Sequence, residues 1–490
     1  MQTRYNCDVI KTKLKSRLRD VVGQYFHLEV EKVFLIISIP IGLCLVFITP
    51  PFQGWDETEH TFRAYQISEL QITPKKVNAS NASGSTMTSS EGYGGYIPRD
   101  IVDQVRNLRF NEDKYGRYDY SKVLSAINTS PNYTQKQPVR FDNTSIYSPT
   151  AYIPQSIGIA LARFFNSPPI LILYTARLFE LFLWILMIYN AIKYIPKGKK
   201  ILLVFALNPV HLFIASTLSP DAIAAGLLAL TTALILKIQY GNTKHYIKYI
   251  SIVIIFIILI TLIKNVYIPL VLLIYLIPKK YFSKKAKLMS IALILLVAIA
   301  WYLQSIKITA YIPDYFAIAE NIDSREQILH IIKNPLNFIA VIIWNVFGTN
   351  SIIINRTYAG VLALNNIPYW VELVWIGTLA YFTLSKSTER VKIEYTRNVK
   401  KMFSVTFIIC MILIIGSLYV GWTAVDDKDI MGIQGRYFIP ISFLLIPILT
   451  SDKLKVMSIN RSTEFWVVSL LAFGIVCTLL SLGVRYLIGV

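Results

Sequence analysis

Long runs of apolar residues, repeated along most of the chain, constrain this fold more than any other feature of the sequence. The runs approach the roughly 20 residues that an α-helix needs to cross the hydrocarbon core of a bilayer. In a chain of 490 residues that is 54% hydrophobic and only 16% charged, a soluble core cannot account for so many of them. The sequence therefore predicts an all-α polytopic membrane protein.

The apolar runs give the expected positions of the helices. Counting runs, we expect about 11–13 membrane helices in total. The main segments are 33–50, 168–192, 201–217, 221–238, 249–263, 266–278, 288–305, 367–384, 402–421, 437–450 and 464–483. Two further apolar segments, 152–165 and 336–347, are short, so we expect them to lie at the interface or dip into the membrane.

The net charge of +20 is spread over short basic segments that separate the apolar runs. These segments are 11–19, 193–200, 279–287, 386–401 and 453–461. Short loops rich in Lys and Arg stay in the cytoplasm, so this pattern predicts a cytoplasmic N-terminus. Because the basic residues form no single patch, the charge does not indicate a nucleic-acid partner.

The same topology divides the chain into four parts. Residues 1–32 form a basic cytoplasmic segment, and residues 33–50 form the first transmembrane helix. Residues 51–150 form one large periplasmic or extracellular loop, with eleven basic and eleven acidic residues, in which we expect short helices and coil. Residues 151–490 form the multi-helix transmembrane domain. The four scattered cysteines indicate neither disulfides nor zinc.

Polar residues gather at the predicted outer ends of the helices. Ionisable groups at membrane spans are costly, so they are candidates for a functional site. The polar segments are 55–60, 147–149, 219–221, 264–265, 365–368 and 434–437. All six fall on the non-cytoplasmic side under this topology, so we expect them to converge on one face of the protein.

The acidic cluster after the first helix holds Asp56, Glu57 and His60. Partial desolvation at a membrane surface can tune a carboxylate for general-base catalysis. Two carboxylates and one histidine also permit, without requiring, a weak site for a divalent cation such as Mg²⁺ or Mn²⁺. The alternative is an ordinary helix N-terminus, where acidic residues interact favourably with the helix dipole.

Two basic residues, Lys264 and Arg436, lie at the same predicted level of the membrane. An ammonium and a guanidinium in this position suit the phosphate of a lipid. The alternatives are an interfacial lysine that extends to the headgroups and a topological arginine anchor. The candidate supporting residues are His60, Tyr147, Asp221, Gln434 and Tyr437, although the sequence around Asp221 is also a good helix start.

Several of these motifs together are similar to those of a known family. They are Pro50-Pro51-Phe52-Gln53-Gly54-Trp55-Asp56-Glu57 with His60, Tyr147-Ser148-Pro149, Ser219-Pro220-Asp221, Lys264-Asn265-Val266-Tyr267 and Gly432-Ile433-Gln434-Gly435-Arg436-Tyr437-Phe438. From about residue 33 to 450 the chain resembles uncharacterised bacterial polytopic membrane proteins related to the type C (GT-C) glycosyltransferases. Trp55 departs from that pattern, because proline is expected there more often.

The resemblance implies an enzyme of the bacterial inner membrane that transfers a hexose, such as glucose, from a polyprenyl (undecaprenyl) phosphate. The acceptor would be an envelope polysaccharide or glycolipid outside the cytoplasm, such as O-antigen or teichoic acid. Asp56 matches the general base, and Glu57 would orient the acceptor or assist Asp56. Arg436 and Lys264 would stabilise the departing phosphate. A donor synthase and a donor-lipid flippase are the implied protein partners.

Two other functions fit part of the same pattern. A polymerase or ligase of lipid-linked polysaccharide shares polar outer loops and phosphate-binding cations. A transporter or flippase of a lipid-linked sugar needs polar residues through the middle of the membrane, whereas here they cluster on one side. The donor and the acceptor distinguish a polymerase or ligase from the hexose-transferring enzyme, since a ligase transfers a long preassembled chain.

Overall fold

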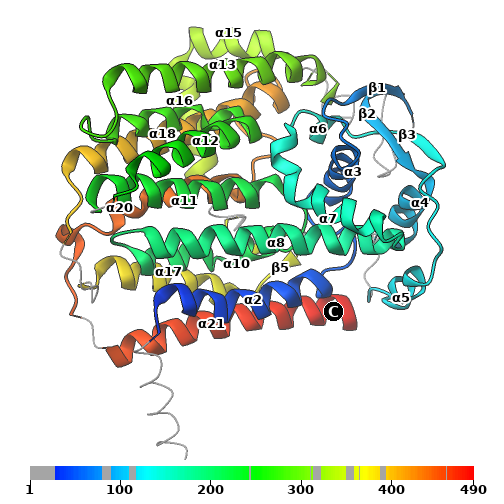
Figure 1. Cartoon of the computed structure of the whole chain (residues 1–490), viewed down its shortest axis with the longest axis horizontal. Coiled ribbons are helices and arrows are strands. Elements are labelled where there is room, and N and C mark those ends of the chain that lie inside the picture. Colours follow the sequence, from blue (N-terminus) through cyan, green and yellow to red (C-terminus); the bar gives the residue numbers. More distant parts are fainter. Residues whose placement is uncertain are drawn as a thin grey trace, which may run out of the picture.

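The computed structural model describes most of the chain beyond the N-terminal segment. The described residues are 28–79, 90–109, 117–241, 244–309, 311–312, 322–348, 358–363, 365–386, 393–458 and 461–489. The predicted cytoplasmic segment 1–32 lies outside these ranges except for residues 28–32, as do positions 387–392 of one basic loop. Figure 1 shows the long helices stacked side by side, with a small sheet at one end of the stack.

Within the described residues, seven helices are long and apolar enough to cross a membrane. They are α2 (Val30–Ile48), α8 (Pro169–Tyr194), α11 (Pro220–Tyr240), α12 (Tyr246–Ile263), α13 (Lys284–Thr309), α18 (Arg397–Trp422) and α21 (Arg461–Gly483), which continues into a π-helical turn at Val484–Ile488. The bent pair α15 (Ser324–Lys333) and α16 (Pro335–Phe347) brings the number of spans to eight if it crosses as one. The predicted all-α polytopic class is confirmed.

The count of full spans is lower than the 11–13 expected, because several apolar runs are broken or short. The run 201–217 is split into α9 (Lys199–Ala206) and α10 (Pro209–Ala215). The run 266–278 is the 3-10 helix η2 (Asn265–Leu276), and 367–384 is the 16-residue α17 (Tyr369–Leu384). The run 437–450 consists of η3 (Gly435–Phe438), α19 (Ile439–Ser442), η4 (Phe443–Leu445) and α20 (Ile446–Leu449).

Proline accounts for the breaks. Pro209 starts α10, and the side chain of Asn208 caps that helix by accepting from the amides of Val210 and His211. Pro269 lies inside η2, while Pro440 and Pro447 are the second residues of the two short helices of the last broken run. A proline lacks the N–H donor that an uninterrupted helix requires, so hydropathy alone overestimates the number of regular spans.

The two short apolar segments form helices, as expected. Residues 152–165 become the end of η1 (Pro149–Tyr152) followed by α7 (Ile153–Phe164), which packs along α8. Residues 336–347 correspond to α16, whose axis is bent by 107° from that of α15. A bend of this size at a short break is typical of a broken span or a re-entrant pair.

The described residues of the large loop 51–150 contain the expected short helices and coil and, in addition, a sheet. Its helices are α3 (Glu57–Ser68), α4 (Arg99–Leu108), α5 (Ser121–Ile127) and α6 (Asp142–Ser145). An antiparallel sheet of order β1-β2-β3 joins them, with β1 (Lys75–Asn78), β2 (Glu91–Pro98) and β3 (Lys136–Arg140). A second, two-stranded sheet lies later in the chain, with β4 (Val361–Leu362) and β5 (Asn365–Asn366).

The sheet was missed because the glycines of β2 look like turn residues in the sequence. In the structure Gly94 pairs with Arg140 of β3, and a Cβ at Gly94 would stand 1.9 Å from the carbonyl oxygen of Val139. The glycine is therefore needed for close approach of two strands, and not for a turn.

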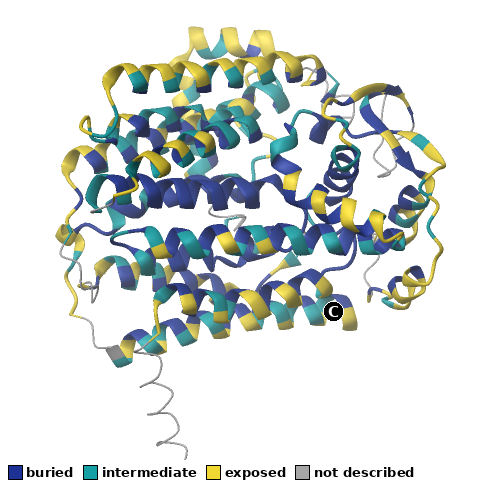
Figure 2. Ribbon diagram, in the orientation of Figure 1, coloured by how far each residue is buried: buried dark blue, intermediate teal, exposed yellow. Residues whose placement is uncertain are grey.

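Burial distinguishes the interior helix from the outer ones (Figure 2). The apolar window of α11 is 94% buried inside the protein, whereas that of α13 is 17% buried. The outer helices expose large apolar side chains, such as Leu296 and Leu470, which suits contact with lipid. Helix α8 packs between α11, α2 and α7 and so forms the second layer of the core.

The close packing of α7 on α8 yields a first prediction. A Cβ at Gly158 would stand 2.7 Å from the backbone carbonyl oxygen of Thr175, which cannot easily move. We expect Gly158→Val to lower the free energy of unfolding by about 1–3 kcal/mol through overpacking. Thermal melting in detergent measures the effect. The control is Gly377→Val, since a Cβ there meets nothing within 4 Å, and equal melting temperatures would contradict the prediction.

Candidate functional site

A buried ion pair holds the framework of the site. The Arg177 guanidinium of α8 binds both carboxylate oxygens of Glu57, at 2.7 Å from Nε and 2.6 Å from Nη2, and both side chains are fully buried. The Glu57 carboxylate also accepts from the amides of Gly54 and Leu218. Because Glu57 is the first residue of α3, this pair fixes the start of α3 against α8 and against the loop before α11.

The same arginine closes the end of the first membrane helix. Arg177 donates to three backbone carbonyls at the end of α2, those of Val46, Thr49 and Pro50, at 2.8–2.9 Å. The last carbonyls of a helix have no partner within it, so these hydrogen bonds satisfy groups that would otherwise be buried alone. Arg177 therefore positions the chain that leads from α2 to Asp56.

One turn further along α8, Glu180 organises the start of α11. Its carboxylate accepts a hydrogen bond from the side-chain amide of Gln155 in α7, at 2.7 Å. It also accepts one from the backbone amide of Ser219, at 3.0 Å. Ser219 in turn caps α11, with Pro220 in the first turn. Arg177 and Glu180 were not among the residues that the sequence predicted. Their signal was present, since two charged residues inside the apolar run 168–192 are costly unless paired.

Asp56 and Arg436 form the first ion pair of the site itself. Asp56 precedes α3 in a left-handed conformation, with φ of 54°, and its Oδ2 lies 2.8 Å from Arg436 Nη2. Gln434 accepts from Arg436 Nε at 2.7 Å, and the guanidinium lies 5.0 Å from the ring centre of Trp55. The Asp56 side chain is 38% exposed while that of Arg436 is 3% exposed, so the carboxylate remains accessible to a ligand.

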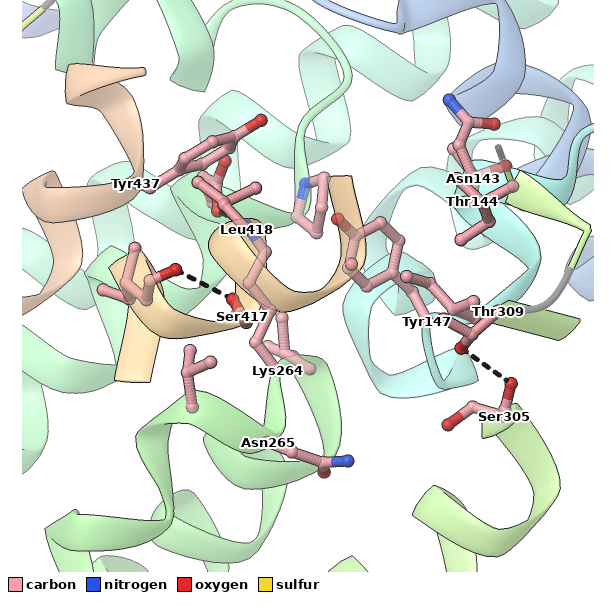
Figure 3. A pocket seen from close by; sticks show the side chains of 18 of the residues that line it. Asn143, Thr144, Tyr147, Lys264, Asn265, Ser305, Thr309, Ser417, Leu418 and Tyr437 are labelled. Atoms are coloured by element: carbon pink, nitrogen blue, oxygen red, sulfur yellow. Dashed lines mark hydrogen bonds and ion pairs between the residues drawn. The ribbon is translucent and has the colours of Figure 1, made fainter. Parts of the chain in front are cut away.

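Lys264 and Asp221 form the second ion pair. Lys264 occupies the break between α12 and η2, and its ammonium binds the Asp221 carboxylate at the start of α11. The ammonium also lies 4.6 Å from the ring centre of Tyr437 and 5.7 Å from that of Tyr147. Figure 3 shows Lys264 between these two tyrosines. Cation–π contact adds to the stability of a charge in this position.

The two ion pairs lie in the wall of one cavity of about 440 Å³. The cavity brings together eight of the nine residues that the sequence singled out, namely Asp56, His60, Tyr147, Asp221, Lys264, Gln434, Arg436 and Tyr437. Glu57 does not line it. Asn365 does not either, since it binds the Tyr486 hydroxyl, so the segment 365–368 does not join the site.

The cavity is chemically divided. Its charged side consists of the two ion pairs, and its apolar side comes from α13 and α18. The apolar side chains include Trp301, Ile414, Leu418 and Trp422, and the same helices add the hydroxyl groups of Tyr302, Ser305, Thr309 and Ser417. Both helices expose much of their surface, in contrast to α11, so the apolar side of the cavity is formed by outer helices of the bundle.

Charge and burial set the protonation states of Asp56 and His60, two cavity groups that lie outside the spans. Partial removal from bulk water inside the cavity favours neutral Asp56. The charge of Arg436, with smaller contributions from His60, the Arg436 hydrogen bond and Lys264, outweighs this desolvation, so the pKa of Asp56 lies below its usual value. Burial lowers the pKa of His60 to about 4, despite the nearby Asp56 charge. His60 is therefore neutral at pH 7, and its Nδ1 lies 2.8 Å from the Tyr152 hydroxyl.

The geometry bears on the divalent site that the sequence permitted. Among the described residues, no group of three or more His, Cys, Asp or Glu side chains is placed to hold a metal ion. Asp56, Glu57 and His60 do not form such a group because both oxygens of Glu57 bind Arg177.

Fold and cavity together define a polytopic helical membrane protein with one charged cavity at the end of its bundle where the sheet lies. The chain belongs to the family described as predicted membrane protein (DUF2142), whose model matches residues 40–445. Neither a curated protein nor a solved structure matches the chain. The family model ends within the last broken apolar run, so it includes every residue of the cavity wall named above.

The buried ion pair yields a second prediction. We expect Arg177→Gln to destabilise the protein by about 3–5 kcal/mol, because it leaves the Glu57 carboxylate buried without its counter-charge. Thermal melting in detergent measures the loss. The matched control is Arg106→Gln, which removes an exposed ion pair with Asp103 and should change the melting temperature little. Equal melting of the two variants would contradict the role given to Arg177.

The buried histidine yields a third prediction. Between pH 6.5 and 4 unfolded His60 takes up a proton while folded His60 stays neutral, so its contribution to stability is lost as the pH falls through this range. One pKa unit corresponds to about 1.4 kcal/mol, so the shift amounts to roughly 3 kcal/mol. We expect His60→Gln to flatten the decline in melting temperature from pH 6.5 to 4. An equal decline in the variant would refute the assignment, and exposed His245→Gln serves as control.

Proposed function

We propose that this protein is a membrane glycosyltransferase that transfers a hexose, such as glucose, from a polyprenyl (undecaprenyl) phosphate to an envelope polysaccharide or glycolipid. One observation carries the proposal: a single cavity combines an accessible carboxylate, the buried Arg436, the half-buried Lys264 and an apolar side formed by the outer helices α13 and α18. A lipid-linked sugar phosphate has the matching parts, which are a hydroxyl-rich head, an anionic phosphate and an apolar chain.

The proposed reaction is a single inverting displacement with Asp56 as the general base. The Asp56 carboxylate takes the proton of the acceptor hydroxyl, and the oxygen attacks the anomeric carbon of the sugar. The bond between that carbon and the phosphate oxygen breaks, so the lipid phosphate leaves with the bonding electrons. A low pKa keeps Asp56 ionised at neutral pH, which a base requires before the proton is transferred.

Arg436 and Lys264 would stabilise the charge that grows on the departing phosphate. Each is already fixed by an aspartate and by aromatic rings, so little reorganisation is needed when the phosphate becomes more negative. Asp56 and the phosphate would share Arg436, because its guanidinium has several donors. The lipid chain would leave the cavity along the apolar side of α13 and α18.

Glu57 has a different role in this proposal from the one expected from the resemblance. The sequence comparison implied that it orients the acceptor or assists Asp56. Its burial against Arg177 supports a positioning role instead, since it fixes the first turn of α3 directly after Asp56. Asp56 would then act as a base without a second carboxylate.

We place the protein in a bacterial inner membrane as part of this proposal, and the distribution of basic residues supports a cytoplasmic N-terminus and a site on the periplasmic or exterior side. Lys199 binds Glu31 at the start of α2, whereas the other end of α2 meets Arg177 beside the cavity. Lys197, also in the basic loop after α8, binds Glu394 and Asp452. The basic loops therefore lie at the end of the bundle opposite the cavity, as the positive-inside rule requires. A donor synthase and a flippase would supply the lipid donor.

The fourth prediction tests the base. We expect Asp56→Asn to reduce transfer of radiolabelled hexose from undecaprenyl phosphate to envelope polysaccharide extracts by about 10²–10⁴-fold. Asparagine tolerates the left-handed backbone of position 56, so the variant should fold. Thermal melting verifies this, and the control is Asp103→Asn on the exposed side of α4.

The outcomes separate the proposal from its alternatives. Transfer by the wild type and by Asp103→Asn, with loss in a folded Asp56→Asn variant, supports the proposal. Movement of the lipid donor across liposome membranes without transfer would instead identify a flippase. Transfer of a long preassembled chain in place of a single hexose would identify a ligase or polymerase.

A further inference from the structure

Exposed lysines around the starts of α12 and α13 carry positive charge that the chain itself does not offset. They form a group that we call the lysine patch, which consists of Lys244, Lys248, Lys279, Lys280, Lys284 and Lys285. From residue 222 to residue 313 the chain contains no Asp or Glu. Among the residues that the structure describes, no member of the patch forms a salt bridge.

The lysine patch lies at the end of the bundle opposite the cavity. Helix α12 begins at Tyr246 and ends just before Lys264, which belongs to the cavity wall. Helix α13 begins at Lys284, and Ser305 and Thr309 near its other end line the same cavity. The 18 residues of α12 therefore separate the patch from the cavity by roughly 27 Å, at 1.5 Å of rise per residue.

A stacked pair of tyrosines joins the two loops that carry the patch. The ring centres of Tyr246, at the start of α12, and Tyr281, before α13, lie 4.5 Å apart. The Lys280 ammonium lies 4.6 Å from the ring centre of Tyr281, and Lys244 and Lys248 flank Tyr246 in the chain. Lysines from both loops thus surround one aromatic stack and form a continuous basic surface.

Other lysines at this end of the bundle are neutralised by carboxylates. The pairs are Lys197 with Glu394 and Asp452, Lys199 with Glu31, and Lys200 with Glu464. The positive-inside rule accounts for lysines at this end in general, but it does not explain why one group is paired and the other is not. The charge of the lysine patch therefore remains available to an anion from outside the chain.

The helices that carry the patch are those most exposed to lipid. The apolar windows of α12 and α13 are 33% and 17% buried, whereas that of α11 is 94% buried. Phospholipid headgroups therefore surround the ends of α12 and α13. Tyrosines such as Tyr246 and Tyr281 are typical of this headgroup level.

We propose that the lysine patch binds the anionic headgroups of phospholipids in the leaflet opposite the cavity. Clusters of about four to eight basic residues beside a membrane helix attract anionic lipids in this way. The proposal does not depend on the reaction in the cavity. It assigns the patch a phospholipid with net negative charge, for which phosphatidylglycerol is the probe.

A variant that combines Lys279→Gln, Lys280→Gln, Lys284→Gln and Lys285→Gln tests the patch. We expect the wild type to prefer phosphatidylglycerol to phosphatidylcholine with the same acyl chains. The preference should fall at least about tenfold in the variant, because each lysine near an anionic surface contributes roughly fivefold. Native mass spectrometry of the purified full-length protein in detergent measures the bound lipid. The side chains are exposed, so the melting temperature without added lipid should change little.

Three further variants separate the charge of the patch from other effects. Arginine at the same four positions keeps the charge and should keep the preference. A control with Lys75→Gln, Lys76→Gln, Lys122→Gln and Lys428→Gln removes four exposed lysines outside the patch and should also keep it. Lys244→Gln with Lys248→Gln tests the α12 side by itself and should weaken the preference.

The outcomes decide the assignment. Equal binding of the two lipids by the wild type, or an unchanged preference in the four-glutamine variant, would overturn it. An equal loss in the control variant would show that only total charge matters, which also contradicts a site. If inorganic phosphate displaces the lipid at an ionic strength at which chloride does not, the patch binds free phosphate and the assignment to a lipid fails.

Discussion

The buried pair between Glu57 and Arg177 is the interaction on which the rest of the site depends. Removing two charges from water is costly, and the pair offsets this cost only because every remaining polar atom finds a partner. The carboxylate accepts two backbone amides, and the guanidinium donates to three carbonyls at the end of α2. As a result, α2, α3, α8 and the loop before α11 meet at one point, and Asp56 extends from that point toward the cavity.

From this fixed framework the cavity acquires two chemically different regions. Two ion pairs form its charged region, and the ring of Tyr437 lies within about 5 Å of both cations. Aromatic and aliphatic side chains of α13 and α18 form the apolar region. Segments far apart in the sequence contribute to each region, and the sheet of the large loop holds α6 in position.

Much of this arrangement follows from sequence patterns whose physical basis is simple. Long apolar runs predicted α8, α11 and α18 to within a few residues, because a membrane requires both length and apolarity. The cost of polar groups at spans selected eight residues of the cavity wall. The same reasoning did not detect Arg177 and Glu180, whose paired charges lie inside an apolar run. It also missed the sheet, since the glycines that allow close strand approach are the same residues that mark turns.

By itself the sequence determined the class of fold and that most of the polar segments gather at one end of the helix bundle, because hydropathy acts locally along the chain. It did not determine how many apolar runs remain unbroken, since that depends on how prolines are accommodated by neighbouring helices. Only the tertiary structure assigned Glu57 to Arg177 and Asp56 to Arg436. Which of the two adjacent carboxylates is buried and which lines the cavity depends on the arginine that packing brings within hydrogen-bond distance of each. Both arginines lie more than a hundred residues away in the sequence.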